Sequence, residues 1–332
     1  MDGPPTGASP APRRGPTGSR DAPPRVAVFG PNPLLTVTIE ARPDGAGEDV
    51  HLHAGGQGVW VTRMAGELGA DPLLCGLVGG EVGAAVRPLL EALPGQCRLV
   101  ASRGGSGCVV ADRRSGERRV LAVAWSPPPS RHELDDLFSL TCAGALGAGA
   151  LVVCNPFPGE ALPLEVYAGL VSNVRASGTP VLIDLSSPRL DSALGSGPDL
   201  VKLNDWELAE YIEGPVDTLE QRRAAVARLR DAGAASVVVT RGGEPAYAVR
   251  NDGAAFELVP PRFDRGSREG CGDTMMGAVA AAWASGRLWL DALVCGMAAG
   301  AANFLRHGLG TGLRPVVEEL VDQVQVRALG RV

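Results

Sequence analysis

An aspartate late in the chain, Asp273, follows three small residues, Gly270, Cys271 and Gly272. The apolar, Ala-rich run after it predicts a buried helix over Thr274–Ser285. At the start of such a helix, free backbone N–H groups and the helix dipole favour an anion, and glycines leave the backbone open to it. A carboxylate there can take a proton from an attacking hydroxyl while the N–H groups hold a phosphoryl group in transfer. The alternative is structural, because Asp is a favoured N-cap, and on this motif alone capping is the better interpretation.

A second polar cluster accompanies the apolar strand predicted over Leu200–Leu203. Lys202 lies in that strand, Asn204 follows it directly, and Glu207 comes three residues later. Amide and carboxylate oxygens at this spacing can share one metal ion or its water shell. They can equally form a capping box, with Asn204 as the N-cap and Glu207 as its partner. The sequence leaves these two interpretations open.

A third loop contains Thr240, Arg241 and Gly242, at the end of the strand predicted over Ser236–Thr240. Its two consecutive glycines would let the backbone pass close to nucleotide phosphates. The chain contains no G-x-x-x-x-G-K-[ST] motif, which excludes a P-loop, and no G-x-G-x-x-G after the first strand, which leaves a dinucleotide site without support. His51 and His53 share one face of a predicted strand, but no third metal ligand accompanies them.

Composition narrows the class of protein that carries these loops. The 332 residues are 45% hydrophobic and 20% charged, as in soluble globular proteins. The formal net charge of −6, with basic residues scattered along the chain, argues against a nucleic-acid partner. The segment from Leu137 to Gly159 carries no charge, but its Gly, Ser, Thr, Asn and Pro favour a helix end, a turn and a strand over a membrane span.

The seven cysteines are odd in number and irregularly spaced, and no C-x-x-C occurs. This pattern favours free thiols in a reducing cytoplasm over disulfides or a zinc site. Cys271 raises a separate hypothesis, because a thiol at a helix N-terminus can have a lowered pKa and react. The simpler interpretation is a small residue in place of Ala.

The pattern of predicted elements changes along the chain. Residues 1–24 are rich in Pro, Gly, Ala, Ser and Arg and predict a disordered tail, and the fold begins with a buried strand at Arg25. Strands with one polar face are then predicted at 36–40, 49–53, 98–102, 107–112 and 119–124, and they would form a small sheet. From about residue 130, helices and apolar strands alternate, which predicts a doubly wound parallel sheet. Three helices complete the chain, at Thr274–Ser285, Leu288–Leu305 and Arg314–Val326.

The chain resembles the PfkB/ribokinase family of sugar kinases. The resemblance rests on the order of the three loops and on two motifs upstream of them, G-G-Q-G at Gly55–Gly58 and N-P at Asn32. The chain is most similar to the 1-phosphofructokinase and tagatose-6-phosphate kinase branch, from Arg25 to the C-terminus, and G-C-G-D is close to the family's G-A-G-D. The resemblance implies a ribokinase-like three-layer α/β/α sandwich with a mostly parallel sheet and a small β-sheet lid drawn from about 36–54 and 98–124. It also implies ATP-dependent phosphorylation of a hydroxyl on a sugar, sugar phosphate or polyol, with ATP and Mg²⁺ as cofactors.

By this resemblance Asp273 is the catalytic base, beside an anion hole formed by the backbone of Gly270, Cys271 and Gly272. Asn204 and Glu207 would organise magnesium through water, and the lid would also form a homodimer interface. The residues implied on the nucleotide side are Lys202, Asn204, Glu207, Thr240, Arg241 and Gly242. Those implied on the acceptor side are Asn32, Thr36, Gly55, Gly56, Gln57, Trp60 and Cys108.

The departures from the family pattern lie mostly on the acceptor side. Thr36 stands where the family has Asp, Gln57 where it has Lys, and Trp60 where it has Asn; Ser106 and Cys108 replace an Arg and an Asn. Losing these cations removes the charge-assisted contacts that would hold a sugar's existing phosphate. A neutral sugar, cyclitol or nucleoside-like alcohol is therefore the favoured acceptor, although Arg63 or Arg268 could replace the lost cation. The alternative function is a catalytically impaired sugar- or nucleotide-binding regulatory protein on the same fold.

Overall fold

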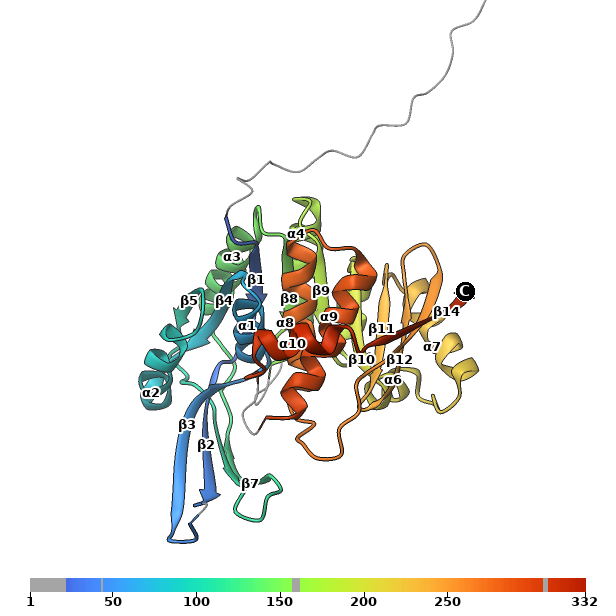
Figure 1. The fold of residues 1–332 in the computed structure, drawn as a ribbon. Helices are drawn as coiled ribbons and strands as arrows, with labels where there is room; N and C mark the ends of the chain where they lie inside the picture. The colour runs from blue at the N-terminus through green and yellow to red at the C-terminus, as the bar shows by residue number, and fades with distance from the viewer. Residues whose placement is uncertain (1–21, 43, 157–161, 307–309) are drawn as a thin grey trace, which may run out of the picture.

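The computed structural model describes residues 22–42, 44–156, 162–306 and 310–332, and its centre is a ten-stranded sheet (Figure 1). From one edge to the other, this sheet contains β14 (Gln325–Arg331), β13 (Ala254–Val259), β12 (Glu244–Val249), β11 (Val237–Arg241), β10 (Leu200–Asn204), β9 (Val181–Asp184), β8 (Ala150–Cys154), β1 (Arg25–Phe29), β4 (Asp71–Val78) and β5 (Gln96–Ala101). The strands from β5 to β11 are parallel, and β12, β13 and β14 are antiparallel additions. The described part of the predicted tail is residues 22–24; the rest lies outside the described residues.

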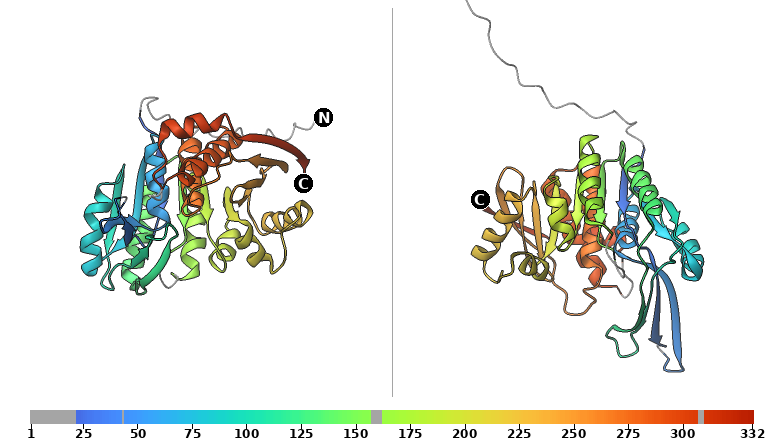
Figure 2. Two further views of the ribbon diagram at one scale, coloured as in Figure 1. Left: turned by 60° about the horizontal axis from the view of Figure 1, so that its bottom comes forward. Right: turned by 180° about the vertical axis from the view of Figure 1, so that it is seen from behind.

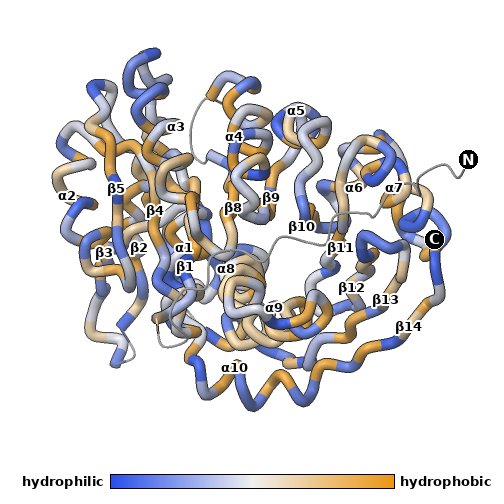
Figure 3. The backbone as a smooth tube through the Cα atoms, turned by 90° about the horizontal axis from the view of Figure 1, so that it is seen from above, coloured by the Kyte–Doolittle hydropathy of each residue, from blue (hydrophilic) through white to orange (hydrophobic). Residues whose placement is uncertain are grey.

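Helices cover both faces of the sheet, which confirms the predicted three-layer sandwich (Figures 2 and 3). One face packs against α1 (Gln57–Glu67), α8 (Cys271–Ala284), α9 (Trp289–Phe304) and α10 (Arg314–Val321), with α2 (Gly80–Glu91) near the β5 edge. The other face packs against α3 (Arg131–Ala145), α4 (Leu164–Ala176), α5 (Arg189–Leu194), α6 (Asp205–Ile212) and α7 (Leu219–Asp231). Because the central strands are covered on both sides, they are continuous apolar runs such as A-L-V-V-C in β8.

A separate four-stranded sheet forms the lid, in the order β3-β2-β6-β7. Its strands are β2 (Leu34–Ala41), β3 (Glu48–Gly55), β6 (Cys108–Asp112) and β7 (Arg119–Ala124). The two central strands, β2 and β6, are parallel, and each pairs antiparallel with its own outer strand. Figures 1 and 2 show the lid projecting from the body below the large sheet.

Two predicted elements are corrected by the structure. The strand predicted at 98–102 belongs to the large sheet as β5, not to the lid, because it pairs in parallel with β4. Its sequence resembles that of a lid strand because β5 lies at the edge of the large sheet, where its side chains are only partly buried. The helix predicted over Arg314–Val326 ends at Val321, and the chain turns into β14, which pairs antiparallel with β13. The alternating V-x-V-x-A pattern belongs to this exposed edge strand.

The sequence analysis did not predict the helices α2 and α5. The uncharged segment beginning at Leu137 falls on the end of α3 and on β8, with its last residues outside the described part. Among the described helices, none combines the length and the hydropathy needed to cross a bilayer.

Candidate active site

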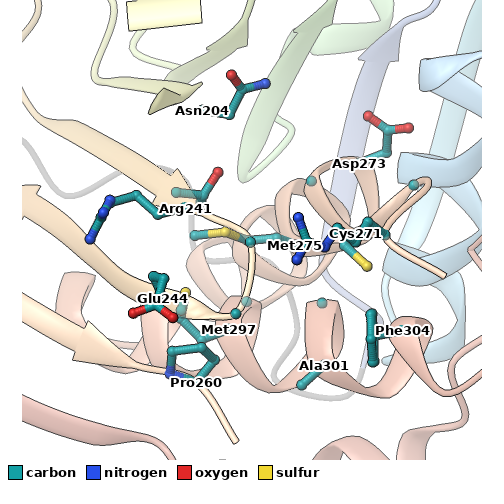
Figure 4. Close-up of a pocket in the computed structure, with 18 of the residues that line it drawn as sticks. Asn204, Arg241, Glu244, Pro260, Cys271, Asp273, Met275, Met297, Ala301 and Phe304 are labelled. Carbon is teal, nitrogen blue, oxygen red and sulfur yellow. The ribbon is translucent and has the colours of Figure 1, made fainter. Parts of the chain in front are cut away.

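A cavity of about 610 Å³ opens where the carboxyl ends of β10 and β11 face the N-terminus of α8. Open parallel sheets bind ligands at this end of their strands. Figure 4 shows Asn204 and Asp273 at one end of the cavity, and Pro260, Met297, Ala301 and Phe304 at the other. The cavity therefore has a polar end, and a mostly apolar end where the Glu244 carboxylate lies beside Met297 and Pro260.

The N-terminus of α8 supplies the polar end. The helix begins at Cys271 rather than Thr274, and its N-cap is Gly270, whose φ of 69° lies in the left-handed region that favours glycine. Asp273 is the third helical residue, and no described side chain caps the helix. The capping interpretation of Asp273 is therefore wrong. The N–H groups of Gly272 and Asp273 belong to the first turn, so they have no acceptor within the helix and can bind an anion.

A buried ion pair lies directly behind this helix end. Lys202 Nζ on β10 is 2.9 Å from Asp184 Oδ2 on β9, and both side chains are buried. A Cβ on Gly272 would lie 2.6 Å from Lys202 Nζ, so the glycine lets the ammonium approach the helix N-terminus. Burial by itself would lower the pKa of Lys202, but the carboxylates around it outweigh burial and raise that pKa. Lys202 therefore carries a fixed positive charge beside the predicted anion hole.

Asp273 is an unusual carboxyl group. Burial raises its pKa to about 7, and the charge of Asp184 adds to this effect. Lys202 and a hydrogen bond from the side chain of Gln57 act in the opposite direction. A carboxylate with a pKa near neutrality can take up and release a proton at working pH, which is what a general base requires.

Asn204 and Glu207 form the capping box of α6. Asn204 Oδ1 accepts from the Glu207 N–H at 2.9 Å, and Glu207 Oε2 accepts from the Asn204 N–H at 2.8 Å. Both residues also line the cavity. Burial raises the pKa of Glu207, although Lys202 opposes that shift. The capping interpretation is confirmed, and it leaves Glu207 Oε1 outside the capping box.

The nucleotide-side residues predicted from sequence lie together in the cavity wall. Thr240 and Arg241 end β11, and Gly242 turns the chain with a φ of 60°. The guanidinium of Arg268 lies across this turn, 3.9 Å from where a Cβ on Gly242 would be. Arg268 therefore lies on the nucleotide side of the cavity, and it does not supply a cation to the acceptor side.

On the acceptor side, most of the predicted residues lie together at the base of the lid. A Cβ on Gly55 would lie 2.4 Å from Thr36 Oγ1 and 3.5 Å from the Trp60 ring, and a Cβ on Gly56 would lie 3.1 Å from the Asn32 carbonyl. Cys108 is placed differently. It pairs with Leu35 and shares that face of the lid, whereas Thr36 points to the opposite face.

Trp60 is buried, and its ring is covered by two basic residues. The guanidinium of Arg63 lies 5.3 Å from the ring centroid, and the imidazole of His53 lies 6.2 Å from it. Burial, together with the charge of Arg63, lowers the pKa of His53 to about 4, so the imidazole is neutral at pH 7. Within the part of the chain that the structure describes, no acid pairs with Arg63.

Similarity to known proteins extends over most of the chain. The profile of the pfkB family carbohydrate kinases matches residues 34–315 of the chain. The chain belongs to this family. A 1-phosphofructokinase from Rhodobacter capsulatus is 29% identical over 231 residues, covering 68% of this chain and 71% of its own. The ATP-dependent 6-phosphofructokinase isozyme 2 of Mycobacterium tuberculosis is 27% identical over 311 residues, covering 90% of this chain and 89% of its own.

Solved structures agree on the fold of this kinase. The phosphofructokinase-2 from Escherichia coli in complex with potassium superposes with a TM-score of 0.80 at 24% identity, covering 90% of this chain and 99% of that one. Ribokinase from Arabidopsis thaliana, complexed with ribose and ATP, superposes with a TM-score of 0.69 at 21% identity, covering 90% and 99%. The sugar-kinase prediction is confirmed at the level of family and reaction class, and nothing in these comparisons favours the regulatory alternative.

The sequence reasoning missed Asp184, which pairs with Lys202 behind the cavity of the kinase site. The available signal was a single acid at the end of the apolar run V-L-I-D, in a strand otherwise buried on both faces. The Cys271 hypothesis is wrong in its direction, because burial raises the pKa of this thiol. Cys271 Sγ instead donates to the Ser267 carbonyl at 3.4 Å. Among the described residues, no group of His, Cys, Asp and Glu is arranged to hold a metal by itself.

Proposed function

We propose that this kinase transfers the γ-phosphoryl group of ATP to a hydroxyl of a sugar, sugar phosphate or related polyol, with Asp273 as the general base. The observation that carries the proposal is the Asp273 carboxyl group, whose pKa of about 7 is combined with a place at the N-terminus of α8. The acceptor hydroxyl would give its proton to Asp273 as its oxygen attacks the γ-phosphorus, and ADP would leave.

The charge that develops on the transferred phosphoryl group needs donors close by. The first-turn N–H groups of Gly272 and Asp273 and the ammonium of Lys202 can serve, since Lys202 lies against Gly272. Gly270 and Cys271 complete the loop of the proposed anion hole. Thr240, Arg241 and Gly242 would hold the nucleotide phosphates, and the apolar end of the cavity, with Met297 and Phe304, would take the base.

Magnesium would be held near Asn204 and Glu207. The residues suit this ion, because Asn204 and Glu207 both line the cavity and Glu207 Oε1 is an oxygen outside the capping box. Mg²⁺ keeps several waters and binds through one or two carboxylates together with substrate phosphates. Glu207 Oε1 would therefore act through water, and the bound ion would neutralise charge on the phosphates.

We make a separate proposal for the class of acceptor. The lid base has Thr36, Gln57 and Trp60 where the family has Asp, Lys and Asn, which supports an acceptor that differs from the phosphofructokinase substrates. Of the two cations considered as replacements, Arg63 lies near the base of the lid, whereas Arg268 lies on the nucleotide side. A neutral sugar, cyclitol or nucleoside-like alcohol is the favoured class, and a phosphosugar held by Arg63 is the alternative.

The test is ATP turnover against a panel of sugars, sugar phosphates, cyclitols and nucleosides, with Asp273→Asn alongside wild type. We expect at least one acceptor to be phosphorylated and the substitution to lower kcat by about two to four decades, as for a general base. A panel with no phosphorylated product from wild type, or equal rates for wild type and Asp273→Asn, would contradict the proposal.

We further propose a homodimer formed through the lid, in a cytoplasmic protein. Support comes from apolar side chains on the outer lid strands, where Val50 is 62% and Leu52 is 58% exposed. They alternate with the polar residues of β3, so they gather on the face opposite His51 and His53. A second copy of this chain could cover that apolar face. The seven free cysteines suit a reducing compartment.

A further inference from the structure

The helix α9 packs against α8 through a row of small residues. A Cβ on Gly296 would lie 2.6 Å from Val279 Cγ2, and a Cβ on Gly300 would lie 3.3 Å from the Cys271 carbonyl oxygen. Gly296, Gly300 and Asn303 follow one another at helical spacing, so they share one face of α9. Close packing along this face brings Asn303, in the last turn of α9, to the beginning of α8.

Asn303 is a polar residue at a buried position. It is 1% exposed, in a helix whose other buried residues are Ala, Gly, Leu, Cys and Met. A buried amide costs free energy unless its donors and its acceptor are hydrogen-bonded, whereas an apolar residue would not have this cost. We therefore expect the amide to have a task that an apolar side chain could not carry out.

The amide of Asn303 joins two segments of the chain. Its Nδ2 donates to the Glu269 carbonyl at 2.9 Å and to Cys271 Sγ at 3.6 Å. Its Oδ1 accepts from the Gly310 N–H at 2.8 Å. A flipped amide would set an oxygen against the Glu269 carbonyl and an NH₂ group against the Gly310 N–H. The partners on the two sides therefore fix the orientation of the amide.

The two partners of Nδ2 are the chain neighbours of Gly270, the N-cap of α8. The chain just before this turn is also tied to α9, because the Ser267 N–H donates to the Phe304 carbonyl at 2.8 Å. Asn303 itself is not among the described residues that line the cavity. It therefore acts on the turn of the proposed anion hole from behind, without contacting a bound ligand.

The partner of Oδ1 lies beside the acceptor side of the site. A Cβ on Gly310 would lie 3.2 Å from both the Cα and the carbonyl oxygen of Trp60, so the two backbones are in close contact. Trp60 is one of the predicted acceptor residues at the base of the lid. Asn303 therefore connects the turn at Gly270 to the backbone that packs on the acceptor side.

We propose that Asn303 is a positioning residue that holds the turn at Gly270 in its anion-binding conformation before a nucleotide binds. This inference rests on the proposed anion hole of the kinase. Preorganised N–H groups stabilise the charge of a transferred group because they need no rearrangement during the reaction. The N–H groups of Gly272 and Asp273 follow this turn directly, so a displaced turn would aim them away from the phosphoryl group.

NMR on the full chain can measure the order of the anion hole at Gly272. Labelling with ¹³C-carbonyl Cys and ¹⁵N-Gly selects the glycines that follow a cysteine, which are Gly76, Gly272 and Gly296. In nucleotide-free wild type, we expect the Gly272 amide to have an order parameter of about 0.85, as in rigid backbone such as β4. Asn303→Leu keeps the branching of the side chain and removes its hydrogen bonds. It should lower the Gly272 value to about 0.6 or below and leave Gly76 unchanged.

Nucleotide affinity gives a second measurement that needs no acceptor. Because the anion hole would hold the γ-phosphate, Asn303→Leu should weaken binding of Mg²⁺–AMPPNP, a non-hydrolysable ATP analogue, about tenfold and change ADP binding less than about twofold. Leu293→Ala, which opens a cavity elsewhere in α9, is the matched control for lost stability. It should lower the melting temperature and leave the ratio of the two affinities and the Gly272 order parameter unchanged.

A mobile Gly272 in nucleotide-free wild type would overturn the inference. So would an Asn303→Leu variant that keeps Gly272 rigid, or one that weakens AMPPNP and ADP equally. If Asn303→Leu does not fold, Asn303→Ala replaces it, because the smaller side chain cannot clash. The proposed function fails separately, through a Gly272 signal that does not shift with Mg²⁺–AMPPNP or a silent acceptor panel. The order parameter needs neither nucleotide nor acceptor, so it decides the positioning role in either case.

Discussion

At the scale of single residues, the proposed mechanism depends on one carboxyl group, Asp273, whose pKa of about 7 lies near neutral pH. The free enzyme can use Asp273 as a base only in its deprotonated form. Since burial places its pKa at about 7, we expect kcat/KM to rise with pH through about 7 and to fall on the acid side. A pH–rate profile of wild type measures this dependence of kcat/KM on pH. A midpoint near pH 4, the ordinary range of Asp, would contradict it.

The buried pair of Asp184 and Lys202 gives a second prediction at this scale. Asp184→Ala leaves the Lys202 ammonium buried without its partner, so we expect a loss of about 3–5 kcal/mol in the free energy of unfolding. Urea denaturation followed by circular dichroism measures this loss. The double variant Asp184→Ala/Lys202→Met removes the buried charge and should recover most of the stability. Equal stability of the single and double variants would show that Lys202 reaches solvent without Asp184.

At the scale of elements, Asn204 and Glu207 form the capping box of α6, and the proposed function gives the same two residues a role in organising Mg²⁺. Glu207→Gln keeps the capping box, because Gln serves equally well there and Gln221 does so in α7. We therefore expect the melting temperature to stay nearly unchanged. The Mg²⁺-dependent gain in ATP affinity should fall about tenfold or more, since the charge that organises the ion is lost.

Isothermal titration calorimetry with ATP, in the presence and absence of Mg²⁺, measures this separation of roles. Glu220→Gln, an exposed glutamate on α7, is the matched control and should change neither quantity. If Glu207→Gln lowers stability and leaves the effect of Mg²⁺ intact, then Glu207 acts only as a cap.

At the scale of the whole molecule, the lid joins the acceptor site to the outer surface. The ion pair between Arg118 and Glu269, at 3.3 Å, connects the turn between β6 and β7 to the residues just before the anion hole. The opposite, apolar face of the lid contains Leu52. A dimer formed there would keep the lid strands in place over the acceptor.

Leu52→Glu should disrupt that dimer, because it places a charge within the proposed apolar interface. Analytical ultracentrifugation should find wild type at twice the chain mass and the variant at the chain mass. Leu288→Glu, which changes an exposed leucine outside the lid, should remain dimeric. A monomeric wild type, or a Leu52→Glu variant that stays dimeric, would refute the lid interface.

The sequence alone determined the reaction class and the three-layer fold, and it predicted Asp273 as the base. These features depend on local patterns: apolar strands alternating with helices, and small residues beside an aspartate at a helix start. The same local patterns misplaced β5, because an edge strand of a large sheet and a strand of a small sheet have the same half-exposed alternation. They also extended the last helix into β14, because the residues of β14 are almost all exposed and give no alternation of burial.

Only the tertiary structure decided how the side chains of the site are partnered. Asp184, Lys202 and Asp273 come from β9, β10 and α8, and Gln57 lines the cavity of Lys202 and Asp273 from α1, more than two hundred residues before Asp273. The sequence placed Gln57 against the acceptor and took Asp273 for a possible cap, whereas in the structure Gln57 Oε1 accepts from the Asn155 N–H and Gly270 is the cap. The physical reason is that a pKa and a hydrogen bond depend on distances between elements, and those distances are set by packing across the sheet rather than by spacing along the chain.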